Sequence, residues 1–170
     1  MTHPATVARD LVVPVCAVTL VWAAVGDAWS YRIPNRLPAL LAVGFAVLAS
    51  FQPPAFVVGG LLTGLGVLAA GSLLFSRGLM GGGDVKLLSA TALWCGPALL
   101  APFALVTSVA GAALALTMLS PLRRLLPPPP ARLAVAGGGG ASLGRQPMPF
   151  GVAIAVGGLW VLSRYAVDFK

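Results

Sequence analysis

The sequence predicts an all-α membrane protein, folded as a polytopic bundle of about six transmembrane helices. Of its 170 residues, 58% are hydrophobic and only 9% are charged, which is unlike the composition of a water-soluble domain. The apolar residues also gather in runs close to the roughly 20 residues that a hydrocarbon core about 30 Å thick requires. Because lipid offers no hydrogen-bond partners, each run must satisfy its own backbone groups, and helices are the expected solution.

Six apolar runs mark the expected helices. The first, at about 11–30, follows Arg9 and Asp10 and has no convincing cleavage site, so we interpret it as a retained span and not as a signal peptide. The second is short, and the fourth and fifth are separated only by Pro97 and Pro102. After the first, the predicted spans lie at about 37–52, 55–76, 84–100, 101–119 and 149–167.

Local composition supports the later spans in turn. The third contains small residues, including Gly60 and Gly64, which permit close helix packing. The fourth begins at Asp84 directly after three glycines, and the sixth begins at Pro149. The segment at about 120–147 contains PPPP and GGGG and is too polar and broken to span, so we expect one domain over residues 1–170 with this segment as a long cytoplasmic loop.

The basic residues predict the orientation of the bundle. With six spans, eight Lys and Arg residues fall on one face and three on the face that carries both termini. The positive-inside rule then places the richer face in the cytoplasm and both termini outside the cytoplasmic membrane. No basic stripe or RNA-binding motif accompanies the net charge of +7, so a nucleic-acid partner is not expected. The richer face holds Arg32, Arg36, Arg77, Lys86, Arg123, Arg124, Arg132 and Arg145, and the other holds Arg9, Arg164 and Lys170.

The chain has four aspartates and no glutamate, which makes the search for carboxylate chemistry short. Asp27 falls near the cytoplasmic end of the first span and Asp84 at the cytoplasmic start of the fourth, whereas Asp10 and Asp168 fall at the outer ends. An ionisable residue inside a membrane span is costly and is a functional hypothesis by default. With His3 as the only histidine, a His-based zinc site or a Ser-His-Asp triad lacks its parts.

Two carboxyl groups at matched depth suit the hydrolysis of a peptide. Held close together, they repel and share one proton, so that one deprotonates a water while the other polarises the scissile carbonyl. Gly81 and Gly83 would let a substrate backbone approach Asp84 closely. From the residues alone, the alternative stays open that Asp84 is simply the N-cap of the fourth helix.

Three short blocks resemble the prepilin peptidases, also called type IV leader peptidases, which are membrane aspartic proteases of the GxGD group. GGGDVKLL at 81–88 is similar to their GxGDVKLL signature, and DAWSYRIPNRL at 27–37 resembles their first catalytic aspartate with its IPN element. MPFG at 148–151 is similar to the PFG that opens their last helix. The blocks occur in the family's order and span nearly the whole chain.

The resemblance implies that Asp27 and Asp84 are the catalytic pair and that no metal or cofactor is needed. It implies cleavage of the basic leader from prepilin-like precursors at the cytoplasmic membrane face. The larger members carry a cysteine-containing insert linked to N-methylation, and 31–37 has no room for it, so we expect a compact, Tad/Flp-type peptidase without methyltransferase activity. The residues expected to bind substrate or shape loops are Ile33, Pro34, Asn35, Gly81, Gly83, Lys86, Pro149, Phe150 and Gly151.

Two of these residues have alternative interpretations. Lys86 is expected to reach lipid phosphate at the interface or to modulate the charge of the acid pair. Asn35 is expected to cap the second helix or to order the loop beneath Asp27.

Other functions remain possible from the sequence. A presenilin-like or signal-peptide-peptidase-like protease would share the mechanism, although Gly26 stands where those proteins usually have Tyr before the aspartate. A small proton-coupled transporter could use both acids as a relay, but it predicts inverted repeats that are not evident. A non-catalytic assembly subunit would leave the two acids without a purpose. The sequence does not indicate the oligomeric state.

Overall fold

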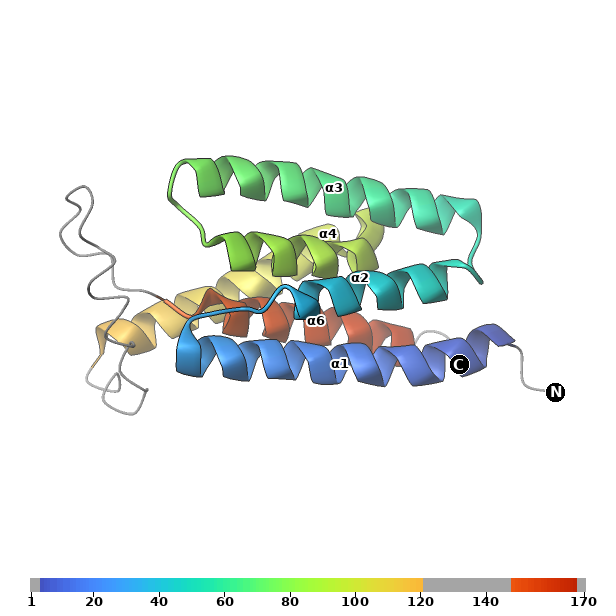
Figure 1. Cartoon of the computed structure of the whole chain (residues 1–170), viewed down its shortest axis with the longest axis horizontal. Coiled ribbons are helices and arrows are strands. Elements are labelled where there is room, and N and C mark those ends of the chain that lie inside the picture. The colour runs from blue at the N-terminus through green and yellow to red at the C-terminus, as the bar shows by residue number, and fades with distance from the viewer. Residues whose placement is uncertain (1–3, 121–147, 168–170) are drawn as a thin grey trace.

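The computed structural model describes residues 4–120 and 148–167, and these residues form helices and short links only. The helices lie side by side in an elongated bundle (Figure 1). The predicted all-α class is therefore confirmed for the described part of the chain. The predicted loop at about 120–147 falls, apart from its first residue, outside the described residues. The helices are α1 (Pro4–Ser30), α2 (Arg36–Ala49), α3 (Pro54–Ser76), α4 (Gly82–Leu119) and α6 (Phe150–Val167).

Three helices, α1, α3 and α4, are long and apolar enough to cross a membrane. The helices α2 and α6 are apolar but shorter. Helix α1 starts at Pro4, several residues before the predicted start at residue 11, because the charged residues Arg9 and Asp10 do not interrupt the helix. They pair with each other at 2.8 Å between Arg9 Nη2 and Asp10 Oδ1.

Helix α4 consists of two arms that meet at Gly96. The backbone there has φ 53° and ψ −174°, which is outside the helical region, and Pro97 follows it. Only glycine adopts this positive φ without strain, and proline lacks the amide that would continue the hydrogen-bond ladder. The predicted boundary between residues 100 and 101 is therefore wrong by about one turn, and Pro102 does not break the second arm.

The two arms of α4 run in opposite directions. The Tyr165 hydroxyl donates to the Trp94 carbonyl at 2.6 Å, and a methyl group on Gly158 would lie 2.8 Å from Thr91, so α6 runs parallel to the first arm. A methyl group on Gly111 would lie 2.9 Å from the Phe150 ring, so the second arm runs antiparallel to α6. The start of α4, the start of α6 and the end of α1 consequently meet at one end of the bundle (Figure 1).

An aromatic cluster holds the opposite part of the bundle together. Trp94 is 1% exposed and contacts the rings of Phe45 and Tyr165 edge-on, with centroids 6.1 Å and 5.5 Å away. Its indole Nε1 donates to the Leu41 carbonyl at 3.1 Å. Phe56 adds α3 to the cluster through a stacked contact with Phe45. Because both polar atoms of this cluster have partners, it ties together α2, α3, α4 and α6 without leaving an unpaired polar group in lipid.

Two of the packed segments are shorter than the hydrocarbon core is thick. Helix α2 has 14 residues, and the first arm of α4, 82–95, also has 14. At 1.5 Å per residue each is about 21 Å long, against a hydrocarbon core of about 30 Å. Both segments start inside the ends of α1 and α3 (Figure 1). Residues at this end of the bundle line a cavity of about 1120 Å³, so we call it the recessed end.

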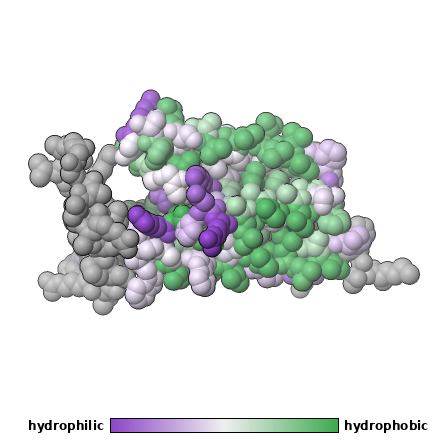
Figure 2. Space-filling view, viewed as in Figure 1, coloured by the Kyte–Doolittle hydropathy of each residue, from purple (hydrophilic) through white to green (hydrophobic). Residues whose placement is uncertain are grey.

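The surface matches a protein embedded in lipid. Large apolar side chains project outward from α1, α3 and α4, among them Leu11 and Trp22 at 66% and 69% exposure. Figure 2 shows hydrophobic residues over much of the helical body and hydrophilic residues gathered near the link between α1 and α2. Such continuous exposed apolar surface is expected against lipid tails and not against water.

Candidate active site

Asp27 lies on the last turn of α1, at the recessed end of the bundle. The helix ends at Ser30 because Tyr31 takes a left-handed φ of 52° and because Pro34 disfavours a helical conformation at Ile33. The Tyr31 amide still donates to the Asp27 carbonyl at 2.9 Å. The Asp27 side chain is only 5% exposed although it carries a carboxyl group. Such burial requires a specific partner.

That partner is the first turn of α6. The Gly151 amide donates to Asp27 Oδ2 at 2.7 Å. A methyl group on Gly151 would lie 2.8 Å from the same oxygen and 3.1 Å from Asp27 Cβ, so only glycine allows this approach. The amides of a first helical turn have no intrahelical acceptors and favour a negative charge, so α6 supplies what the buried carboxylate needs.

Asp84 lies in the first turn of α4. Gly81, with φ −73° and ψ 142°, occupies the N-cap position, so the alternative that Asp84 is itself the N-cap residue is wrong. A methyl group on Gly81 would lie 2.9 Å from Asp84 Oδ2, which places the carboxyl group back over the link from α3. Gly78, with φ 67°, makes the turn in that link. Asp84 is half-buried.

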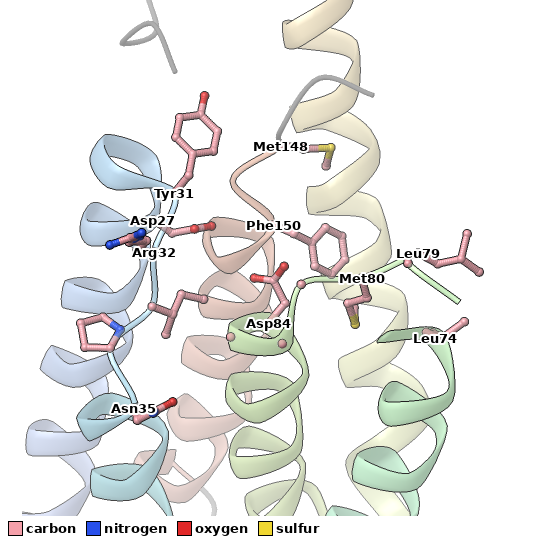
Figure 3. Close-up of a pocket in the computed structure, with 16 residues that line it drawn as sticks. Asp27, Tyr31, Arg32, Asn35, Leu74, Leu79, Met80, Asp84, Met148 and Phe150 are labelled. Atoms are coloured by element: carbon pink, nitrogen blue, oxygen red, sulfur yellow. The ribbon is translucent and has the colours of Figure 1, made fainter. Parts of the chain in front are cut away.

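Both acids line one cavity of about 1120 Å³ at the recessed end of the bundle. Figure 3 shows Asp27 on α1, Asp84 on α4 and the Phe150 ring from the start of α6 around this cavity. Arg32 is the only Lys or Arg among the lining residues. The lining residues are Asp27, Tyr31, Arg32, Ile33, Pro34, Asn35, Leu74, Gly78, Leu79, Met80, Gly81, Gly82, Gly83, Asp84, Met148 and Phe150.

The structure places most of the predicted auxiliary residues on this cavity but not all of them. Gly151 contacts Asp27 from beneath the lining, and Pro149 is fully buried. Lys86 is exposed, and its Nζ donates to Asn35 Oδ1 at 3.0 Å. Asn35 stands at the N-cap position of α2 but makes no capping bond with its side chain, so that expectation is wrong. Its amide oxygen is taken up by Lys86. The predicted residues on the cavity wall are Ile33, Pro34, Asn35, Gly81, Gly83 and Phe150.

Sequence reasoning missed part of the lining. Tyr31 and Arg32 stand between Asp27 and the IPN element, and Met80 directly precedes the glycines, so proximity to the motifs could have indicated them. Leu74 had no such signal, because it comes from the last turn of α3 and only the turn at Gly78 brings it to the cavity. Leu74 and Met80 give the cavity an apolar side opposite the polar link between α1 and α2.

The described residues contain no cluster of three or more His, Cys, Asp or Glu side chains that could hold a metal ion. Cys16 and Cys95 are buried, unpaired thiols within α1 and α4, away from the cavity wall. The carboxyl groups of Asp27 and Asp84 are therefore the acidic groups that the arrangement offers for proton transfer in this cavity.

Comparison with known proteins adds one positive finding. The family model described as the type IV leader peptidase family matches residues 15–116. The match includes Asp27, the IPN element and the GGGD segment, and it stops before the start of α6. No curated protein and no solved structure matches the chain in the same comparisons.

Proposed function

Because the chain belongs to the type IV leader peptidase family, we propose that it is an aspartic endopeptidase that removes the basic leader from type IV prepilin-like precursors. The observation that carries the proposal is the meeting of Asp27 and Asp84, from separate helices, on the wall of one cavity. The family itself is one of membrane peptidases. The aspartic mechanism and the prepilin-like substrate are parts of the proposal.

The proposed mechanism uses the two carboxyl groups in different states. The ionised one takes a proton from a water molecule, whose oxygen attacks the scissile carbonyl, while the protonated one donates to that carbonyl oxygen. The C–N bond of the resulting tetrahedral intermediate then breaks as a proton passes from the pair to the nitrogen, which releases a carboxylic acid and an amine. Two like charges that face one cavity repel each other, which favours the singly protonated pair.

The proposal specifies a compact, Flp-type peptidase without methyltransferase activity. The link between α1 and α2 consists of residues 31–35 only, which leaves no room there for a cysteine-containing insert. The apolar side of the cavity, formed by residues such as Leu79, Met80 and Phe150, suits the apolar segment that follows the leader in such substrates. A lipid bilayer is the second partner, and no nucleic-acid partner is proposed.

The direct test uses the full chain reconstituted in liposomes. A synthetic peptide with a basic leader, a glycine at the junction and an apolar helix should be cut once, directly after the leader, as read by mass spectrometry. A peptide whose leader lysines are replaced by glutamates is the substrate control. Cuts inside the apolar helix would favour an intramembrane protease. An intact peptide together with proton uptake into the liposomes would favour a transporter.

We propose further that each arm of α4 crosses the cytoplasmic membrane, giving six spans with both termini outside and the cavity facing the cytoplasm. In support, Arg32, Arg36, Arg77 and Lys86 lie at the cavity end, whereas Arg9 and Arg164 lie towards the other. Basic residues concentrate on the cytoplasmic side.

Cysteine labelling tests this orientation. In a background of Cys16→Ala and Cys95→Ala, Ser50→Cys should react with an impermeant maleimide in intact cells. Arg77→Cys should react only after the membrane is opened. Both positions are exposed: Ser50 follows α2 in the link before α3, and Arg77 directly follows α3. The reverse labelling pattern would place the cavity outside and contradict the proposed orientation.

A further inference from the structure

The link between α1 and α2 follows the helix end that carries Asp27 and contacts the start of α4, which carries Asp84. It begins at Tyr31, the one residue other than glycine with a positive φ in the described part of the chain, at 52°. A left-handed conformation is unfavourable at a bulky residue and persists only where the surrounding structure holds it. The link that follows Tyr31 makes its contacts with the rest of the bundle through Ile33 and Asn35.

Ile33 is wedged between the first turns of α4 and α6. A methyl group on Gly83 would lie 3.3 Å from Ile33 Cβ, and one on Gly151 would lie 2.9 Å from Ile33 Cδ1. Gly83 directly precedes Asp84, and Gly151 holds Asp27 through its amide. The side chain of Ile33 therefore touches the backbone that positions each acid, and the link lines the same cavity as both acids (Figure 3).

Asn35 anchors the far end of the same link. Its Oδ1 accepts the hydrogen bond from Lys86 Nζ at 3.0 Å, which joins residues 51 positions apart in the sequence. Lys86 is two residues beyond Asp84 on α4. The link is thus attached to α4 through a polar contact and inserted between α4 and α6 through an apolar one.

We propose that Ile33 is a positioning residue that sets the separation of the Asp27 and Asp84 carboxyl groups, with the Asn35–Lys86 hydrogen bond keeping it in place. This inference rests on the proposed function, since it assigns a role within the same acid pair. Ile33 contacts no reacting atom. It acts through Gly83 and Gly151 and excludes water from the side of the cavity where the two helices meet.

The separation has a measurable consequence because it decides how strongly the two acids influence each other. The charged and titratable groups on the cavity wall are Asp27 from α1, Asp84 from α4, and Tyr31 and Arg32 from the link; α3 and α6 contribute none. Close acids share a proton over a wide pH range, which gives a broad bell-shaped rate profile. Water admitted between the two carboxyl groups screens their repulsion, and this narrows the pH range over which they share one proton.

The experiment compares three isoleucine variants of the reconstituted full chain. Ile33→Ala should lower kcat on the order of 100-fold, with little change in KM, because displacements of about 1 Å at reacting groups have costs of this size. It should also narrow the pH profile. Ile33→Val, which keeps Cβ against Gly83, should retain most of the rate. Ile154→Ala is the matched control, since Ile154 is fully buried on α6 but does not line the cavity.

A double-mutant cycle tests the anchor independently. Lys86→Met and Asn35→Ala should each lower kcat by about fivefold, within the range of coupling between contacting residues, and the double variant should lose no more than either one. Lys86→Arg keeps a donor and should restore the rate. If Ile33→Ala does not accumulate in the membrane, the positioning role is tested by this cycle and by Ile33→Val.

The outcomes separate the two proposals. Suppose that the wild-type chain cleaves the peptide and that Ile33→Ala, like Ile154→Ala, loses activity without a change in its pH profile. The positioning role of Ile33 is then overturned, while the proposed peptidase activity stands. Additive losses in the cycle would also overturn the anchor. If the wild-type chain cleaves nothing, the proposed function itself fails.

Discussion

Asp27→Asn and Asp84→Asn should each abolish processing of a co-expressed pilin precursor, with a loss of about 100- to 10,000-fold or more in kcat. An amide has nearly the shape of the carboxyl group but neither takes nor gives a proton under these conditions, so the step that generates the nucleophile is lost. The fold should survive, because the side-chain oxygen of asparagine still accepts the bond that the Gly151 amide donates to Asp27 Oδ2. Immunoblots of precursor and mature pilin measure the effect.

Asp10→Asn is the matched control for both variants. Asp10 is an exposed acid near the other end of α1, paired with its neighbour Arg9. It should process the precursor at the wild-type rate. Membrane fractions must hold similar amounts of all three proteins. Wild-type processing by either Asp27→Asn or Asp84→Asn would refute the acid pair as the catalytic centre.

Gly151→Ala should lower kcat on the order of 100-fold although it adds a single methyl group. That methyl would lie 2.8 Å from Asp27 Oδ2 and 2.9 Å from Ile33 Cδ1, closer than carbon atoms pack, so the carboxyl group or α6 must move. A displacement of this kind at a reacting group is expensive in rate. Initial rates with the reconstituted protein and the synthetic precursor peptide measure it.

Gly66→Ala is the control for this variant. A methyl group on Gly66, in α3, would meet no atom within 4 Å, so the same substitution there should leave the rate and the unfolding midpoint unchanged. A Gly151→Ala enzyme with the wild-type rate would mean that the close contact between α6 and Asp27 does not position the acid during the reaction.

Several features could be predicted from local sequence because their cause is local. Apolar runs of membrane length predict helices wherever they occur, since a backbone in lipid has no other partner than itself. The acids Asp27 and Asp84 could be singled out because a carboxyl group in such a run is costly enough to require a reason. The end of α1 before Pro34 follows from proline's effect on its neighbour.

Other features could not be predicted, because they depend on which segments meet. The break in α4 was expected between residues 100 and 101, but the structure has it at Gly96, where the reversal of direction requires a positive φ. Asn35 was expected to cap α2, yet its side chain bonds to Lys86, which only the packing of α4 brings within reach. No local rule weighs a cap against a partner 51 residues away.

By itself, the sequence determined a helical membrane protein with two acids at one end of its spans, because hydropathy and the cost of a charge in lipid act on each segment separately. Only the tertiary structure decided that the amide of Gly151 holds Asp27, that Ile33 stands between the first turns of α4 and α6, and that Leu74 reaches the cavity. These contacts join residues that are distant along the chain, and their geometry comes from how the helices pack against one another.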